Sequence, residues 1–232
     1  MHILNKFFDK IYCINLLERP DRKQLVQERF DKLGIEVEFL NAVKFGFANN
    51  IIQSNLFNFL NKNQPNEFGC TLSHYQCIKK AYLQGYNNVL IFEDDVKFYK
   101  NFNNIIEQKL NNVPDNWDLL YLYSGIWLWN ENHQWVVENE LLTSNECWTA
   151  LGYAINKKFM GHIINYIDND CRTIDTLFVI LQNLQKYNIY SIYPNVCAPD
   201  LNSKSNLLPD NISQLGFDNV VTFGDFLKED YE

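Results

Sequence analysis

The chain has 232 residues, enough for one large domain or two small ones with a sizeable core. Its composition, 47% apolar and 21% charged, is typical of a globular protein. The net charge of −8 argues against a nucleic acid or an anionic membrane held by bulk electrostatics, but it leaves room for a local basic pocket that binds phosphate.

The cysteines and the N-terminus narrow the class of protein further. No cysteine pair forms a C-x-x-C motif, and the spacings fit no zinc pattern, so we expect buried free thiols in a reducing compartment. The first ten residues contain no apolar leader-like segment, and no apolar run is long enough to span a membrane. These features predict a soluble, cytoplasmic protein without a transmembrane segment.

The predicted elements begin with alternating strands and helices. Residues 10–16 (KIYCINL) are rich in β-branched and aromatic residues and predict a strand. Residues 21–33 have helical apolar spacing, with Asp21 placed as the N-terminal cap and Gly34 as the residue that ends the helix. Residues 36–43 predict a second strand, and this order implies a parallel pair with a right-handed crossover.

The rest of the chain predicts one α/β domain over residues 1–232 with a mostly parallel sheet. A helix is expected over 68–85, ended by Gly85, and a strand over 88–94. The remaining expected elements are strands over 117–124, 147–156 and 189–194, a hairpin over 126–138 that turns at 130–132, and helices over 157–167 and 175–187.

The stretch VLIFEDDVKF places Glu93, Asp94 and Asp95 directly after four apolar residues. Neighbouring carboxylates repel, and the end of a buried strand is a costly place to leave them unpaired. Three kinds of partner can stabilise this negative charge: a metal ion, a Lys or Arg side chain, or water.

The position of these acids favours a ligand site. Ligands of open parallel sheets bind beyond the carboxyl ends of the strands. Because side chains alternate along a strand, we expect Glu93 and Asp95 to share one face and Asp94 to point to the other. A diphosphate bridged by Mg²⁺ or Mn²⁺ suits such carboxylates, and an inert solvated turn is the alternative.

Two further stretches contain candidate binding residues. INLLERPDRKQ places Arg19 and Arg22 at the start of a helix, where phosphate binds well, although solvated surface charge explains them equally. No glycine-rich phosphate loop is present. FGCTLSHYQC places Ser73 and His74 early in the next helix, and a lone histidine there is more often structural than catalytic.

Together these stretches resemble glycosyltransferase family 25, which includes lipooligosaccharide and collagen galactosyltransferases. The family patterns I-N-L-x-x-R-x-D-R, G-C-x-L-S-H and L-I-x-E-D-D stand here, in that order, as INLLERPDR, GCTLSH and LIFEDD. The resemblance is strong over the first hundred residues and weaker through LGYAIN and TIDTLF.

The resemblance implies a GT-A-like fold, with a nucleotide-binding half over residues 1–100 and an acceptor-side half over 101–232. It implies a metal-dependent, inverting transfer of a hexose, commonly galactose, from a UDP-sugar to a hydroxyl acceptor on a glycan or a hydroxylysine-type side chain. The implied cofactor is Mn²⁺ or Mg²⁺, with Asp95 as the direct ligand and Glu93 or Asp94 in support. The implied donor-binding residues are Asn15, Arg19, Arg22, Ala42, Ser73 and His74. Asp175 is the candidate catalytic base, and a helix N-cap is its alternative role.

Departures from the family pattern keep other classes open. Lys44 stands where the family often has an acid, and Asn206 follows Ser205 where an acid is expected. A glycosyltransferase-fold scaffold without catalysis is therefore one alternative. A phosphotransferase or phosphatase is another, but it would need a nucleophilic Asp after the first strand, where Asn15 stands. Three tryptophans, at 127, 129 and 135, suit either stacking on a sugar ring or packing.

Overall fold

The computed structural model describes residues 1–44, 65–124, 134–144, 147–169, 172–200 and 230–232. Its helices are α1 (Ile3–Phe7), α2 (Pro20–Leu33), α4 (Pro65–Gln84), α5 (Phe102–Asn111), α6 (Lys157–Asn169) and α7 (Ile174–Asn183). Its strands are β1 (Lys10–Asn15), β2 (Glu38–Asn41), β3 (Asn88–Glu93), β4 (Val96–Phe98), β5 (Leu119–Tyr121), β6 (Trp135–Val137), β7 (Leu141–Thr143), β8 (Gly152–Asn156), β9 (Ile189–Ile192) and β10 (Cys197–Pro199).

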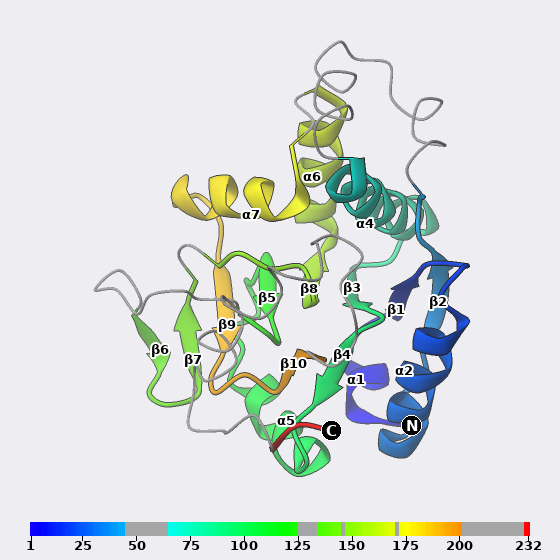
Figure 1. Cartoon of the computed structure of the whole chain (residues 1–232). Helices are drawn as coiled ribbons and strands as arrows, with labels where there is room; N and C mark the ends of the chain where they lie inside the picture. The colour runs from blue at the N-terminus through cyan, green and yellow to red at the C-terminus, as the bar shows by residue number, and fades with distance from the viewer. Residues whose placement is uncertain (45–64, 125–133, 145–146, 170–171, 201–229) are drawn as a thin grey trace, which may run out of the picture.

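One large sheet organises the described part of the chain (Figure 1). It has eight strands in the order β2-β1-β3-β8-β5-β9-β7-β6. The pairing directions show that β8 and β7 run opposite to the other strands. The expected α/β class with a mostly parallel sheet is therefore confirmed, and so is the parallel pairing of the first two strands.

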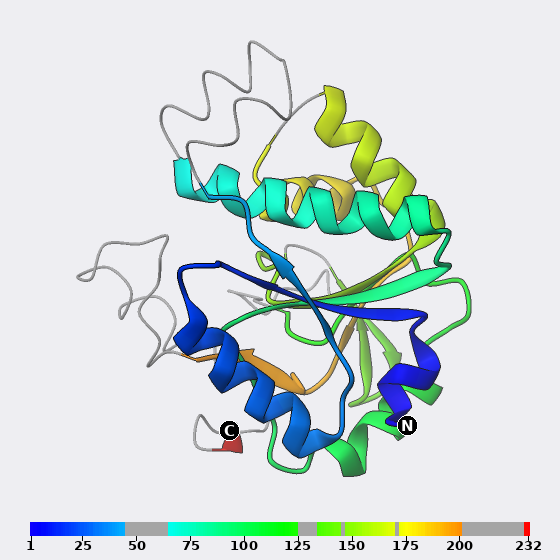
Figure 2. The ribbon, with the colours of Figure 1, turned by 90° about the vertical axis from the view of Figure 1, so that its right-hand side faces the viewer.

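Helices cover both faces of this sheet (Figure 2). The helices α4, α6 and α7 lie on one face, where Leu72, Ile163 and Phe178 join the alternate strand residues Tyr12 and Ile14 in one core cluster. The helices α1, α2 and α5 lie on the other face, with the second core cluster. Alternating side chains along β1 and β3 thus contribute to two separate cores, which explains why each strand contains four consecutive apolar residues.

The helix ends follow from local chemistry. Gly34 and Gly85 both have a positive φ, of 76° and 84°, in the left-handed region that glycine adopts without strain, so both expected helix ends are confirmed. The expected N-terminal cap of α2 is wrong. Pro20 occupies the first turn and Arg19 is the cap residue, while the Asp21 carboxylate accepts hydrogen bonds from the Arg19 side chain instead.

Several elements differ from the sequence prediction. The hairpin seen is β6–β7, which turns at Asn139 with a positive φ of 58°, whereas the turn expected at 130–132 lies outside the described residues. The strand β9 lies between β5 and β7 and does not close the sheet. The strand expected over 147–156 is shorter and begins at Gly152. The sequence patterns do not predict the elements α1, β4, α5, β7 and β10.

A second, two-stranded sheet forms directly after β3. The strand β4 pairs antiparallel with β10, joining residues from the middle of the chain to residues 197–199. Asp94 and Asp95 lie in the turn between β3 and β4, so this small sheet fixes the chain on the far side of the acidic turn. Among the described residues, no helix is long and apolar enough to cross a lipid bilayer.

Candidate active site

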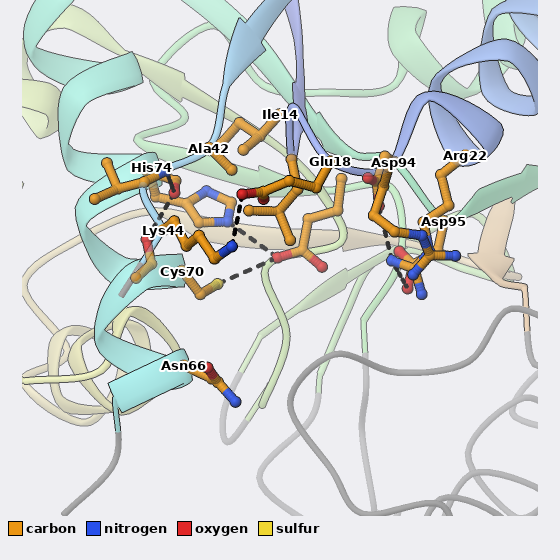
Figure 3. A pocket seen from close by; sticks show the side chains of 16 residues that line it. Ile14, Glu18, Arg22, Ala42, Lys44, Asn66, Cys70, His74, Asp94 and Asp95 are labelled. Carbon is orange, nitrogen blue, oxygen red and sulfur yellow. Dashed lines mark hydrogen bonds and ion pairs between the residues drawn. The ribbon is translucent and has the colours of Figure 1, made fainter. Parts of the chain in front are cut away.

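A cavity of about 360 Å³ lies at the carboxyl ends of β1 and β3, beside the first half of α4 (Figure 3). This is where open sheets of this kind bind their ligands. The cavity brings together most of the residues predicted from the sequence, namely Arg19, Arg22, Ala42, Ser73, His74, Glu93, Asp94 and Asp95. Two predicted residues, Asn15 and Asp175, are not part of its lining.

Asp94 is neutralised by protein side chains. Arg22 Nη1 donates to Asp94 Oδ1 at 2.9 Å, and Asn15 Nδ2 donates to Asp94 Oδ2 at 2.7 Å. Burial raises the pKa of Asp94, and the Arg22 charge and the two hydrogen bonds oppose that rise. Of the three partners considered for the acidic triplet, a protein arginine is thus the answer for Asp94. Asn15 contributes by binding this carboxylate from behind the cavity wall.

Glu93 belongs to a different cluster, on the α4 side of the cavity. Its Oε1 lies 3.1 Å from His74 Nε2 and accepts from Cys70 Sγ at 3.5 Å. Burial raises the pKa of Glu93, but the hydrogen bonds from His74 and Cys70 and the charge of His74 hold it below its ordinary value. The other ring nitrogen, His74 Nδ1, lies 2.9 Å from Tyr153 Oη on β8, which fixes the imidazole.

Asp95 is the carboxylate with unused hydrogen-bonding capacity. Its Oδ1 is buried and has no hydrogen-bond partner among the described residues, while Oδ2 lies 3.9 Å from Arg22 Nη1. Burial, with the charge of Glu93 in second place, raises the pKa of Asp95 to about 7. The expected alternation applies only as far as Glu93, because β3 ends there and Asp94 and Asp95 lie in a turn. In Figure 3, Asp94 and Asp95 lie together beside Arg22.

Two residues that the sequence reading missed hold the acidic turn in place. The Asp200 backbone N–H donates to Asp95 O at 2.7 Å, and the Asp200 carboxylate forms a buried ion pair with Arg29 of α2. Arg29 Nη1 also donates to Val96 O at 3.0 Å. Arg29 lies seven residues, or about two helical turns, after Arg22 on the same helix face, and this spacing was its only sequence signal. Asp200 gave no signal because it is more than a hundred residues away from the turn.

Ser73 connects α4 to the loop after β2. Its Oγ donates to Gly69 O at 2.6 Å and accepts from the backbone N–H of Val43 at 2.8 Å. The neighbouring Ala42 N–H donates to Asn15 O at 2.8 Å, so this loop is tied to both α4 and β1. Ser73 and Ala42 therefore shape the cavity wall that the sequence predicted for the donor.

Two ion pairs lie at the cavity rim. The Arg19 guanidinium binds the exposed Asp21 carboxylate at 2.8 Å, and this contact lowers the pKa of Asp21 to about 2. Lys44, which stands where the resembling family often has an acid, forms an ion pair with Glu18 at 2.6 Å. Arg19 and Lys44 thus lie at the cavity rim, each paired with a carboxylate.

Asp175 is the second residue of α7, and the cap residue of that helix is Thr173, so the alternative role of Asp175 as N-cap is wrong. Its Oδ1 is buried without a hydrogen-bond partner among the described residues. Burial, followed by the charge of Glu93, raises the pKa of Asp175 to about 6. The start of α7 is fixed to α4, because the Ile174 N–H donates to Thr71 Oγ1 at 2.9 Å.

Four further residues considered in the sequence lie outside the described part of the chain, namely Trp127, Trp129, Ser205 and Asn206. Trp135 is 39% exposed, and its ring packs edge-on against Tyr193. The expected free thiols are confirmed at every cysteine described, namely 13, 70, 77, 147 and 197, and all but Cys70 are buried.

The fold and the cavity together define an α/β protein with a candidate ligand site at the carboxyl edge of its sheet. Carboxylates line this site, and Arg19 and Lys44 lie at its rim. The family model described as glycosyltransferase family 25 (LPS biosynthesis protein) matches residues 8–178, which include every element that lines the cavity. The chain belongs to glycosyltransferase family 25.

Curated relatives agree with this assignment. A glycosyltransferase 25 family member from Aedes aegypti is 32% identical over 162 residues, covering 63% of this chain and 26% of the relative. A procollagen lysyl hydroxylase and glycosyltransferase from Acanthamoeba polyphaga mimivirus is 29% identical over 209 residues, covering 80% and 23%. An inactive glycosyltransferase 25 family member 3 from Homo sapiens is 32% identical over 128 residues, covering 50% and 22%. The match thus spans about a quarter of the length of these relatives.

Proposed function

We propose that the chain is an inverting glycosyltransferase that moves a hexose, galactose by family resemblance, from a UDP-sugar to a hydroxyl group. The observation that carries this proposal is the pair of Glu93 and Asp95 at the cavity. The charge of Glu93 raises the pKa of Asp95, after burial, and Asp95 Oδ1 is buried with no hydrogen-bond partner among the described residues. An unpaired buried carboxylate of this kind is costly unless a cation binds it.

Mn²⁺ or Mg²⁺ fits this donor set. Oxygen ligands from one or two carboxylates, completed by phosphate oxygens and water, are what hard divalent cations take. Asp95 is the proposed direct ligand and Glu93 the proposed second, whereas Asp94 is already committed to Arg22 and Asn15. When bound, such a cation would stabilise the negative charge of the departing diphosphate.

The cavity itself is the proposed donor site. The loop held by Ser73 and Ala42 forms one wall, and Arg19 and Lys44 border it with positive charge. A nucleotide diphosphate carries negative charge that these side chains would attract, and its sugar would lie near the end of β3. In this proposal Arg22 acts through Asp94 and positions the acidic turn.

Asp175 is the proposed base. In the transfer, the acceptor oxygen forms a bond to the anomeric carbon, the bond from that carbon to the diphosphate oxygen breaks, and the hydroxyl proton passes to a carboxylate. A carboxyl group with a pKa of about 6 is largely ionised at neutral pH and is basic enough to accept that proton.

Two of the comparisons support the proposed class of acceptor. The mimivirus relative is named as a procollagen lysyl hydroxylase and glycosyltransferase, and the family description refers to LPS biosynthesis. We accordingly propose a hydroxyl acceptor on a glycan or on a hydroxylysine-type protein side chain.

A thermal-shift series tests the donor and the cation together. UDP, UDP-galactose and UDP-glucose are added with Mn²⁺ or with a chelator, and stabilisation is expected only when nucleotide and cation are both present. Asp95→Asn should abolish the cation-dependent part of the stabilisation. Asp115→Asn, which changes an exposed carboxylate outside the cavity lining, should retain it. Nucleotide stabilisation that survives Asp95→Asn unchanged contradicts the assigned cation site.

A scaffold without catalysis is the second candidate function, because the human relative is named as inactive. Release of UDP from UDP-galactose, measured with and without an added hydroxyl acceptor, separates the two candidates. Cation-dependent UDP binding without any turnover would favour the scaffold.

A further inference from the structure

Cys70, His74 and Glu93 bring a thiol, an imidazole and a carboxylate together at the cavity surface. Their sulfur, nitrogen and oxygen atoms all lie within 4.8 Å of one another. Cys70 and His74 are one helical turn apart on α4, so they point the same way, and Glu93 reaches them from the end of β3. Figure 3 shows Cys70 and His74 on one side of the cavity and Asp94 and Asp95 on the other.

Two of the three atom separations in this cluster are close to those between the ligands of a tetrahedral zinc ion. Bond lengths of about 2.3 Å to sulfur and about 2.1 Å to nitrogen or oxygen imply a sulfur–oxygen edge of roughly 3.6 Å and a nitrogen–oxygen edge of roughly 3.4 Å. Cys70 Sγ lies 3.5 Å from Glu93 Oε1, and His74 Nε2 lies 3.1 Å from the same oxygen. The third separation, between the Cys70 sulfur and the His74 ring nitrogen, is at most 4.8 Å, so side-chain movements of about an ångström would place one ion between all three atoms.

Two neighbours support an ion in this place. Tyr153 Oη contacts His74 Nδ1 at 2.9 Å, which holds the ring with Nε2 directed at Glu93, as the outer contacts of metal-binding histidines do. Asp175, which interacts electrostatically with both Glu93 and Cys70, keeps a buried Oδ1 without a hydrogen-bond partner among the described residues. This carboxylate adds negative charge beside the cluster that a divalent cation would offset.

We propose that Cys70, His74 and Glu93 form a binding site for a thiophilic divalent cation of the Zn²⁺ class, distinct from the Mn²⁺ or Mg²⁺ site proposed at Asp95. Thiolate and imidazole ligands select Zn²⁺ or Co²⁺ over the hard cations that carboxylates alone prefer. Three protein ligands leave the fourth position of the ion facing the cavity, where water or an anionic ligand can occupy it. Glu93 is a proposed ligand of both sites, so an ion bound at one site is expected to change the affinity of the other.

Cobalt binding by the full chain tests the site without any activity measurement. The protein is stripped with a chelator and titrated with Co²⁺, and a thiolate-to-cobalt charge-transfer absorption in the near ultraviolet is expected. Zn²⁺ should bleach this band, and an equal concentration of Mg²⁺ should leave it in place. Cys70→Ser should lose the band and weaken Zn²⁺ binding by at least about tenfold.

Two further variants make the result specific to this cluster. Cys77→Ala, which changes a buried thiol on the same helix, should keep the band, and so should Asp95→Asn. The melting temperature of each variant confirms that it is folded, and Glu93→Gln serves as the second ligand variant if Cys70→Ser does not fold. Absence of the band in the native chain, or its survival in the ligand variants, overturns the proposal. Loss of the band in Asp95→Asn overturns it too, because the ion then sits on the acidic turn.

Discussion

Arg22 Nη1 and Asp94 Oδ1 lie 2.9 Å apart, and each side chain is less than a tenth exposed. This pair joins the first turns of α2 to the turn after β3, so it sets the position of one cavity wall relative to the other. It also divides the acidic triplet. All three carboxylates line the cavity, but Arg22 and Asn15 bind Asp94, whereas His74 and Cys70 contact Glu93. The three carboxylates therefore have different roles although they are consecutive in the chain.

We predict that Asp94→Ala destabilises the fold by about 3 kcal/mol, because it removes the carboxylate that binds the buried Arg22 guanidinium at 2.9 Å and leaves the longer contact with Asp95, at 3.9 Å. Urea unfolding measures the change in the free energy of unfolding. Asp21→Ala is the matched control, since it removes the carboxylate from the exposed pair with Arg19, and its midpoint should stay close to that of the native chain. Equal midpoints for the two variants contradict a structural role for the Arg22–Asp94 pair.

The stability of the cation-free protein should fall as the pH rises from 6 to 7. The pKa of Asp95 is raised from 3.8 to about 7, so in this range the folded chain holds a proton that the unfolded chain has released. Unfolding then releases protons, and the free energy of unfolding drops by at most about 1.4 kcal/mol per pH unit from this group. Thermal melts in the presence of a chelator measure the effect.

Asp95→Asn should remove this contribution while leaving that of every other titrating group, histidines included. The difference between native and variant melting temperatures is therefore the informative quantity. A difference that stays constant between pH 6 and pH 7 shows that Asp95 is already ionised in the folded chain.

Asp175→Asn should lower the turnover of a UDP-sugar by about 10²- to 10⁴-fold, the usual contribution of a general base, with little change in nucleotide binding. In the native chain kcat/KM should rise as the pH increases through about 6, the pKa of Asp175, and the variant should lack this rise. Asp115→Asn, which changes an exposed carboxylate before β5, is the control. If Asp175→Asn keeps the native turnover rate and the native rise of kcat/KM with pH, Asp175 is not the base.

Ser73→Ala should weaken nucleotide binding more than it slows turnover. The variant leaves the Val43 N–H without its acceptor and frees the loop that forms the donor wall, at a cost of about 1–3 kcal/mol in folding. Calorimetry with UDP measures the affinity, and steady-state kinetics separate KM from kcat. Ser73→Thr retains the hydroxyl and should restore most of the affinity, and failure of that rescue argues that packing, not the hydrogen bond, holds the loop.

The parts of the fold that the sequence predicted well depend on local patterns. Apolar strands such as residues 10–16 and glycines at helix ends depend on nearby residues alone, and the structure places them where expected. Short elements such as β4 and β10 escaped prediction because each is three residues long and exists only through pairing with the other. The position of β9 inside the sheet depends on long-range order that no local pattern encodes.

The same difference between local patterns and long-range contacts applies to the candidate site. The acidic triplet, Arg22 and His74 were recognisable from motifs, and the cavity brings them together. Their unequal roles were not recognisable, because they arise from tertiary contacts such as Asn15 with Asp94 and Asp200 with the acidic turn. Cys70 carried a usable signal, the one-turn spacing to His74, but its third partner comes from another element.

The antiparallel strand β8 affects the order in which the protein can be completed during synthesis. It lies against β3, and the carbonyl of Leu151, the residue before β8, accepts a hydrogen bond from the backbone N–H of Glu93 at 2.9 Å. The ribosome adds roughly 60 residues between these two strands, which takes several seconds at usual elongation rates. During that interval β3 has an open edge, so the nascent first half of the chain would depend on chaperones or on rapid elongation to avoid aggregation.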